Sequence, residues 1–330
     1  MISYTVRVDG RDRTDDSGGH ATDAYAELRP KAPVEPRLDS HDPLTQLRES
    51  VIETLEAMPS FFQFDTTIEG VNATDLQNAN TLLGSSIEVQ VVATLNRLRE
   101  LWDPDQQWQG YRFERQAQAF PDVRLVKGRG DTAKIALGIE LKGWYLFSKE
   151  GVPTFRFAAT PAACAAHDLL CVVPWHFSNV TAGTPVAREP WVVSARWAAE
   201  YRNHWWTHVR RSNSDKTVSS PAGAAPYPRK AEHSADIPAY DGGSNFGRIA
   251  RVKGLMDDFV HASKQLDALG IPVQDWISFF AAHTDSAEFE AVQQRLAGIL
   301  TSKKLAVTQE RADRLAHLVG EIHTVLTGGE

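Results

Sequence analysis

The chain has 330 residues, 42% of them hydrophobic, which is enough to bury a substantial core. Its formal net charge of −7 argues against a protein that coats nucleic acid indiscriminately, although a locally basic cleft is compatible with that charge. There is no run of about 18 apolar residues and no apolar signal segment in the first residues, so we expect a cytoplasmic protein without membrane association.

The N-terminal part of the chain predicts an arm followed by two helices. Residues 9–42 are rich in Asp, Arg, Gly and Pro, so we expect 1–43 to be a flexible arm. Asp42-Pro43 then introduces an amphipathic helix over 44–58. A second helix is expected over about 83–98, with Asn80 and Thr81 as candidate caps. Its apolar stripe consists of Leu83, Ile87, Val91, Leu95 and Leu98.

Glu88 lies at the edge of that second stripe, because it is three and seven residues before Val91 and Leu95. A carboxylate in this position can point at a neighbouring sheet. It can equally bend to solvent or pair with an arginine, so its role stays open at this level.

Two short apolar segments follow, each carrying acidic side chains. Asp122, after Pro121, opens a segment over 123–126. Branched and aliphatic residues then alternate over 135–141, and the alternation predicts a strand over 135–144. The Gly and Asp residues in 128–131 predict a turn between the two segments, which we therefore expect to pair as a hairpin. Pro104-Asp105 is a similar dipeptide, but its surroundings favour a turn.

The alternation assigns side chains to faces of the expected strand. Glu140 and Lys142 share one face with Ala136 and Gly138, whose small side chains are expected to leave room for a ligand. Glu140 to Lys142 is the only acidic-x-Lys triplet in the chain. Taken singly, these residues are more typical of a solvated strand face and a turn.

Downstream of the triplet, residues 160–167 predict a short capped helix with Pro161 at its first position, and 169–173 predict a strand. Cys164 and Cys171 fall in these two segments and have no partner set for zinc, so we expect two buried thiols.

Pro121, Asp122, Glu140 and Lys142 resemble the signature of the PD-(D/E)XK nuclease superfamily, which includes many restriction endonucleases and repair nucleases. The resemblance covers about 80–177. It implies an α/β fold with a restriction-endonuclease-like core, in which a central mixed β-sheet flanked by helices is built in the order α-β-β-β-α-β. We expect this core over 44–180, with a mainly helical accessory region over 181–330.

The resemblance also implies the chemistry. Asp122 and Glu140 are the expected ligands of Mg²⁺, for which Mn²⁺ would substitute, and Glu88 and the Leu141 carbonyl are candidate further ligands. Lys142 would orient or help to deprotonate the attacking water and would stabilise the developing phosphorane charge. Three converging carboxylates should raise one another's pKa in the absence of a cation.

A basic, aromatic-rich segment is the candidate DNA contact. Between 196 and 230 there are seven basic and two acidic residues, a local charge of +5, and a helix is expected over about 192–211. Arg202, Arg210 and Arg211 are the candidate phosphate contacts, although each could equally be a solvated arginine on a packed helix. His204 and His208 share a helix face, but no third metal ligand is evident.

The rest of the chain predicts a loop over 212–243 and helices over 246–269, 273–282, 287–300 and 309–326.

Together these features favour a Mg²⁺-dependent DNA endonuclease of the type II restriction kind, acting on double-stranded DNA and commonly as a homodimer. One alternative is a nuclease subunit of a phage-defence or repair system, and another is a noncatalytic DNA-binding protein on the same fold. A cognate methyltransferase is a possible partner of the first, and a defence-system subunit of the second.

Overall fold

The computed structural model describes residues 30–62, 67–68, 79–116, 119–148 and 150–282. The chain divides into two compact units, Met1–Ala32 and Pro33–Glu330, and every helix and strand described below belongs to the second unit. Most of the arm expected over 1–43 lies outside the described residues, as do the helices expected over 287–300 and 309–326.

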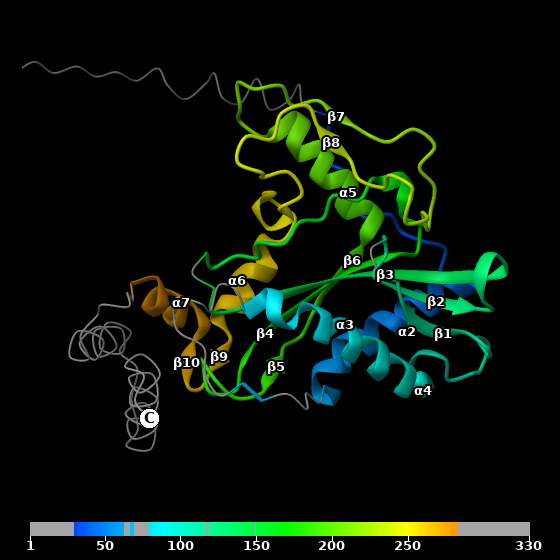
Figure 1. The fold of residues 1–330 in the computed structure, drawn as a ribbon, viewed down its shortest axis with the longest axis horizontal. Helices are drawn as coiled ribbons and strands as arrows, with labels where there is room; N and C mark the ends of the chain where they lie inside the picture. The colour runs from blue at the N-terminus through cyan, green and yellow to red at the C-terminus, as the bar shows by residue number, and fades with distance from the viewer. Residues whose placement is uncertain (1–29, 63–66, 69–78, 117–118, 149, 283–330) are drawn as a thin grey trace, which may run out of the picture. The chain divides into compact units, whose positions relative to one another are not determined.

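The described part of the second unit is built around a mixed β-sheet (Figure 1). Strands β1 (Arg112–Arg115), β2 (Val123–Lys127) and β3 (Lys134–Tyr145) pair antiparallel in chain order, and β4 (Leu169–Phe177) runs parallel to β3. The far side of β4 pairs antiparallel with β5 (Pro185–Ala187) at one end and with β6 (Trp191–Ser194) at the other. The predicted mixed α/β class, with helices flanking a mixed sheet, is confirmed.

One face of the sheet is covered by helices (Figure 1). Helix α3 (Ala79–Arg97) contacts β1 and β3, and α2 (Pro43–Ala57) contacts β3 and the short α4 (Arg99–Trp102). A 3-10 turn, η1 (Met58–Phe61), follows α2. No helix within the described ranges is long and apolar enough to cross a membrane.

The apolar stripes of α2 and α3 and the aliphatic side chains of β2 and β3 form a continuous core. This core includes Val51, Leu55, Val91, Leu95, Val123, Leu125, Leu137 and Ile139, all fully buried. The burial of these side chains is the main driving force for placing the helices on this face.

The two N-terminal helices agree with the sequence pattern, and one predicted cap does not. The Asp42 side chain accepts a hydrogen bond of 3.0 Å from the backbone N–H of Leu44, and Pro43 occupies the first turn of α2. Helix α3 already includes Asn80 and Thr81, so the prediction that they cap it is wrong.

The expected hairpin is formed by β2 and β3, and its register pairs Val123 with Ile139. The ladder shifts by one residue between Leu125 and Val126, a β-bulge that leaves the pairing on the side of Val123 unaffected. The connection includes a 3-10 turn, η3 (Gly130–Thr132), and Gly128 has a φ of 89°, a conformation that favours glycine.

The crossover from β3 to β4 is less helical than the sequence pattern predicts. Only a single 3-10 turn, η4 (Pro161–Ala163), forms within the helix expected over 160–167. Backbone groups here are used by other segments, since Thr160 donates its N–H to Ser234 and Ala165 donates to the Asp168 carboxylate at 2.7 Å. These bonds compete with a continuous helix.

The sheet continues past the expected core boundary at 180, because β5 and β6 both pair with β4. The helix expected from Val192 begins later, since residues 191–194 are strand β6. Ser194 caps α5 (Ala195–His204) by accepting from the Trp197 N–H at 3.3 Å, and a π-helical turn, η5 (Trp205–Val209), follows α5. Pairing with β4 therefore overrides the helical pattern at the start of this segment.

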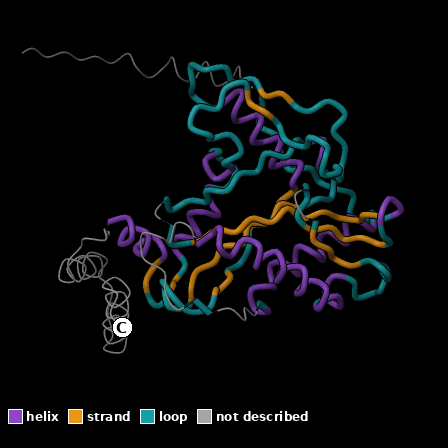
Figure 2. The backbone as a smooth tube through the Cα atoms, in the orientation of Figure 1, coloured by secondary structure: helices purple, strands orange, loops and turns teal. Residues whose placement is uncertain are grey.

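Beyond α5 the chain is mostly irregular, as Figure 2 shows. The loop expected over 212–243 carries only the short pair β7 (Val218–Ser219) and β8 (Ile237–Pro238). The helix expected over 246–269 is reduced to α6 (Asp257–Gln265), preceded by the 3-10 turn η6 (Ile249–Arg251), because Gly247 and Gly254 have φ values of 81° and 87°. A hairpin of β9 (Asp267–Ala268) and β10 (Ile271–Pro272) then leads into α7 (Val273–Ala282), which confirms the helix expected over 273–282.

Candidate active site

The register of the β2–β3 hairpin brings the two predicted carboxylates together. Asp122 immediately precedes β2, and since Val123 is paired with Ile139, the period of two places Asp122 on the same face as Glu140. The backbone N–H of Leu141 donates a hydrogen bond of 2.9 Å to Oδ2 of Asp122. This bond holds the Asp122 carboxylate against β3.

Lys142 completes a group of three side chains, Asp122, Glu140 and Lys142, which we call the carboxylate pair and its lysine. Its Nζ lies 2.6 Å from Oε1 of Glu140 and 3.5 Å from Oδ2 of Asp122. The three side chains are only 12 to 24% exposed, so their charges are poorly screened by water. The structure thus brings Asp122, Glu140 and Lys142 together as the sequence predicted.

Burial dominates the electrostatics of this group. Burial, with a smaller contribution from the negative charge of Asp122, raises the pKa of Glu140 to about 7, although Lys142 acts in the opposite direction. Burial alone would lower the pKa of Lys142, but Glu140 and Asp122 outweigh it and raise that pKa. At neutral pH Lys142 is therefore a cation, while Glu140 is close to the midpoint of its titration.

Glu88 is not part of this group. Its carboxylate accepts from Arg115, with Oε2 lying 2.6 Å from Nη2 and 3.2 Å from Nε. Arg115 is paired with Val123, so it belongs to the face of the sheet that α3 covers, opposite Glu140. The prediction that Glu88 contributes to the metal site is wrong, because spacing along a helix does not fix which face of the sheet the helix covers.

The space beside Gly138 is filled, contrary to expectation. A Cβ atom on Gly138 would lie 2.6 Å from Cγ of Pro121 and 2.9 Å from Oδ1 of Asp168. Gly138 therefore allows a close approach of Pro121 and Asp168, and it does not leave an open ligand site.

Asp168 is a buried residue of this region that the sequence pattern did not identify. It precedes β4 and accepts from the backbone N–H of Gly138 at 2.8 Å, from that of Ala165 and from the hydroxyl of Tyr227 at 2.9 Å. Burial raises its pKa even though these hydrogen bonds act to lower it. The only available signal was an acid directly before the apolar run at 169–173.

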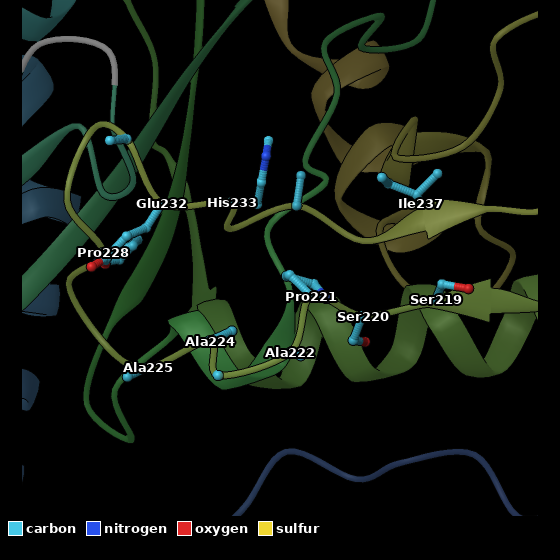
Figure 3. Close-up of a pocket in the computed structure, with 13 residues that line it drawn as sticks. Ser219, Ser220, Pro221, Ala222, Ala224, Ala225, Pro228, Glu232, His233 and Ile237 are labelled. Carbon is cyan, nitrogen blue, oxygen red and sulfur yellow. The ribbon is translucent and has the colours of Figure 1, made fainter.

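Tyr227 belongs to the long loop between β7 and β8, which it fixes to the sheet next to Gly138 through Asp168. A pocket of about 580 Å³ lies within that loop (Figure 3). Ala222, Ala224 and Ala225 line one side of it, across from Glu232 and His233. The pocket includes none of the predicted catalytic residues.

The three predicted DNA contacts, Arg202 in α5 and Arg210 and Arg211 just after η5, are only partly at the surface. Arg202 is 1% exposed, and its guanidinium donates to the buried carboxylate of Asp236 at 2.6 Å and to the carbonyl of Phe157 at 2.7 Å. The prediction that Arg202 contacts DNA is wrong, because an interior acid holds its guanidinium in the core. Arg211 is exposed, and Arg210 lies over the ring of Trp206 at 3.8 Å.

The two histidines of the same segment, His204 and His208, have ring centroids 5.2 Å apart, and burial and then the charge of His208 lower the pKa of His204. Across the described ranges, no group of three or more His, Cys, Asp or Glu side chains could hold a metal ion. Cys164 and Cys171 are both buried free thiols, as predicted.

The chain was compared with models of protein families, with curated proteins and with solved structures. None of them matches it.

Proposed function

We propose that the chain is a Mg²⁺-dependent DNA endonuclease related to the PD-(D/E)XK nucleases. The observation that carries the proposal is the convergence of Asp122 and Glu140 on the Nζ atom of Lys142. A supporting observation is the order α3, β1, β2, β3, η4, β4, with β4 parallel to β3, which follows the expected core except for its reduced second helix.

The donor set suits Mg²⁺. Proteins often bind this ion through one or two carboxylates, with water and substrate oxygens filling the remaining positions. Asp122 and Glu140 would hold it, and the Leu141 carbonyl is a further candidate through the resemblance. Mn²⁺ would substitute. A cation there would also offset the cost of keeping the buried Glu140 carboxylate ionised. When bound, the metal would neutralise charge on the attacked phosphate and lower the pKa of a bound water.

The residues of the chain itself have separable roles in this proposal. Lys142 is protonated at neutral pH, so it would donate a hydrogen bond to a phosphate oxygen and stabilise the charge that develops during attack. Protonation makes it a poor base for removing a proton from water. Asp122 would keep its position through the bond from the Leu141 N–H.

The proposal is tested by incubating the purified chain with double-stranded plasmid and phage DNA in Mg²⁺ or in EDTA. We expect the wild-type chain to cleave DNA in Mg²⁺ and not in EDTA. The cleavage rate should fall by roughly 100-fold or more in Asp122→Ala and in Lys142→Ala. Glu88→Gln is the matched control, since it changes an acid on the opposite face and should retain most of the activity. Cleavage that persists in both Asp122→Ala and Lys142→Ala would contradict the site. Discrete fragments would indicate restriction-type cleavage, whereas smearing would indicate nonspecific cleavage.

A further inference from the structure

Arg124 lies on the same face of the sheet as the carboxylate pair and its lysine. It is paired with Gly138 across the β2–β3 ladder, and Gly138 is two residues before Glu140. Because side chains alternate along a strand, Arg124, Asp122, Glu140 and Lys142 all project from one side of the hairpin. This places a fourth charged group next to the candidate active site.

The Arg124 guanidinium has unsatisfied hydrogen-bonding capacity. The side chain is half-buried, and its Nε is shielded from solvent without a hydrogen-bond partner in the described part of the protein. A buried donor without a partner is costly, typically by about 1 to 3 kcal/mol. The Nη groups of Arg124 also have no hydrogen bond or ion pair within the described residues, and they are the part of the guanidinium that a ligand can reach.

The acids next to Arg124 in the sheet are already occupied by other partners. Glu114, directly across the β1–β2 ladder, forms an ion pair with Arg112. Asp122 accepts from the Leu141 N–H and lies near Lys142. Asp168 has three donors of its own. Arg124 is therefore not one half of a structural ion pair with any of them.

We propose that Arg124 forms an anion subsite that binds a phosphate of the DNA backbone adjacent to the cleaved one. This inference rests on the proposed function. The planar guanidinium suits a phosphate because its two terminal Nη groups, which unlike Nε are not shielded from solvent, can donate parallel hydrogen bonds to two phosphate oxygens. Its positive charge also offsets the two carboxylates that a polyanionic substrate meets on this face.

The inference is tested by steady-state cleavage of a duplex in Mg²⁺ over a range of salt concentrations. Arg124→Met keeps much of the apolar stem and removes the charge. We expect kcat/KM to fall by about 10- to 100-fold, mainly through KM, as for the loss of a charge-assisted hydrogen-bonded contact. The plot of log kcat/KM against log salt should become shallower by about 0.9, the value for one phosphate contact.

Arg129→Ala is the matched control, because it removes the same charge from an exposed position in the turn of this hairpin. An Arg124→Met enzyme with the KM and salt slope of Arg129→Ala would overturn the inference and leave the proposed function standing. If Arg124→Met does not fold, Arg124→Lys is measured instead, because lysine keeps the charge but lacks the planar guanidinium. A raised KM with an unchanged salt slope would support the subsite, and an unchanged KM would overturn it. Wild-type protein that cleaves no DNA in Mg²⁺ would overturn both proposals.

Discussion

At the scale of single residues, environment separates side chains that look alike in the sequence. Glu88 and Glu140 were both candidate metal ligands, yet Glu88 pairs with Arg115 on the helix-covered face while Glu140 contacts Lys142 on the other. The pKa of Glu140 is raised to about 7 mainly by burial, with a smaller contribution from Asp122, whereas the sequence led us to expect repulsion between carboxylates as the cause. The identity of a residue limits its chemistry, and its packing decides which chemistry is available.

His176 gives a prediction at this scale that is independent of function. It is buried in β4, where Nδ1 lies 2.7 Å from the Phe177 carbonyl and Nε2 accepts from Nε of Arg188 at 3.1 Å. Burial, with a smaller effect of Arg188, lowers its pKa from 6.5 to about 4.

Because the unfolded chain binds the His176 proton near pH 6.5 and the folded chain binds it only near pH 4, folding stability is lost as the pH falls between these values. The expected loss is at most about 3 kcal/mol. Urea unfolding at several pH values should show this slope in wild-type protein and a flatter one in His176→Gln. An identical slope in both proteins would exclude His176 as its source.

At the scale of elements, helix α5 buries one face fully and leaves its other residues half-buried. Ala195, Ala198, Ala199 and Arg202 are buried. The Arg202 guanidinium donates to the carbonyls of Phe157 and Ala159 and to the carboxylate of Asp236. It thereby joins α5 to the β3–β4 crossover and to the long loop.

Arg202→Ala should destabilise the fold by about 3 to 5 kcal/mol, since it leaves the Asp236 carboxylate buried without its cation. The measurement is the unfolding free energy in urea. Arg211→Ala, at an exposed position just beyond the same helical segment, should change that free energy by less than about 0.5 kcal/mol. Equal effects of the two variants would contradict the interior role of Arg202.

At the scale of the whole second unit, a few polar contacts join segments that are far apart in the sequence. Glu35, in the stretch expected to be a free arm, accepts at Oε1 from the Ser194 N–H at 2.7 Å and from Arg48 at 3.0 Å. The carbonyl of Pro33 accepts from Trp197. Residues from Pro33 onward are thus connected to α2, β6 and α5.

Glu35→Ala should lower the unfolding free energy by about 1 to 2 kcal/mol, because the Ser194 N–H loses its acceptor while the ion pair with Arg48 is partly screened by solvent. Glu49→Ala, an exposed acid on α2, is the control and should have little effect. Thermal or urea unfolding of the two variants side by side provides the comparison. A free N-terminal arm would predict no difference between them.

Local patterning by itself determined several parts of the fold. Alternation over 135–144, the apolar run at 169–173 and the stripe of 44–58 each correspond to an element of the predicted type. The sequence also predicted the pairing of β2 with β3, but the register that places Asp122 beside Glu140 came from the structure. These features succeed because the periods of strands and helices are set by the local backbone.

Only the tertiary structure decided the rest. It placed Glu88 behind the sheet, filled the space at Gly138 with Pro121 and Asp168, buried Arg202 against Asp236 and left the Nε of Arg124 without a partner. Each of these outcomes depends on contacts between residues that are distant in the sequence. A local period states which residues share a face, but packing between elements determines what that face meets.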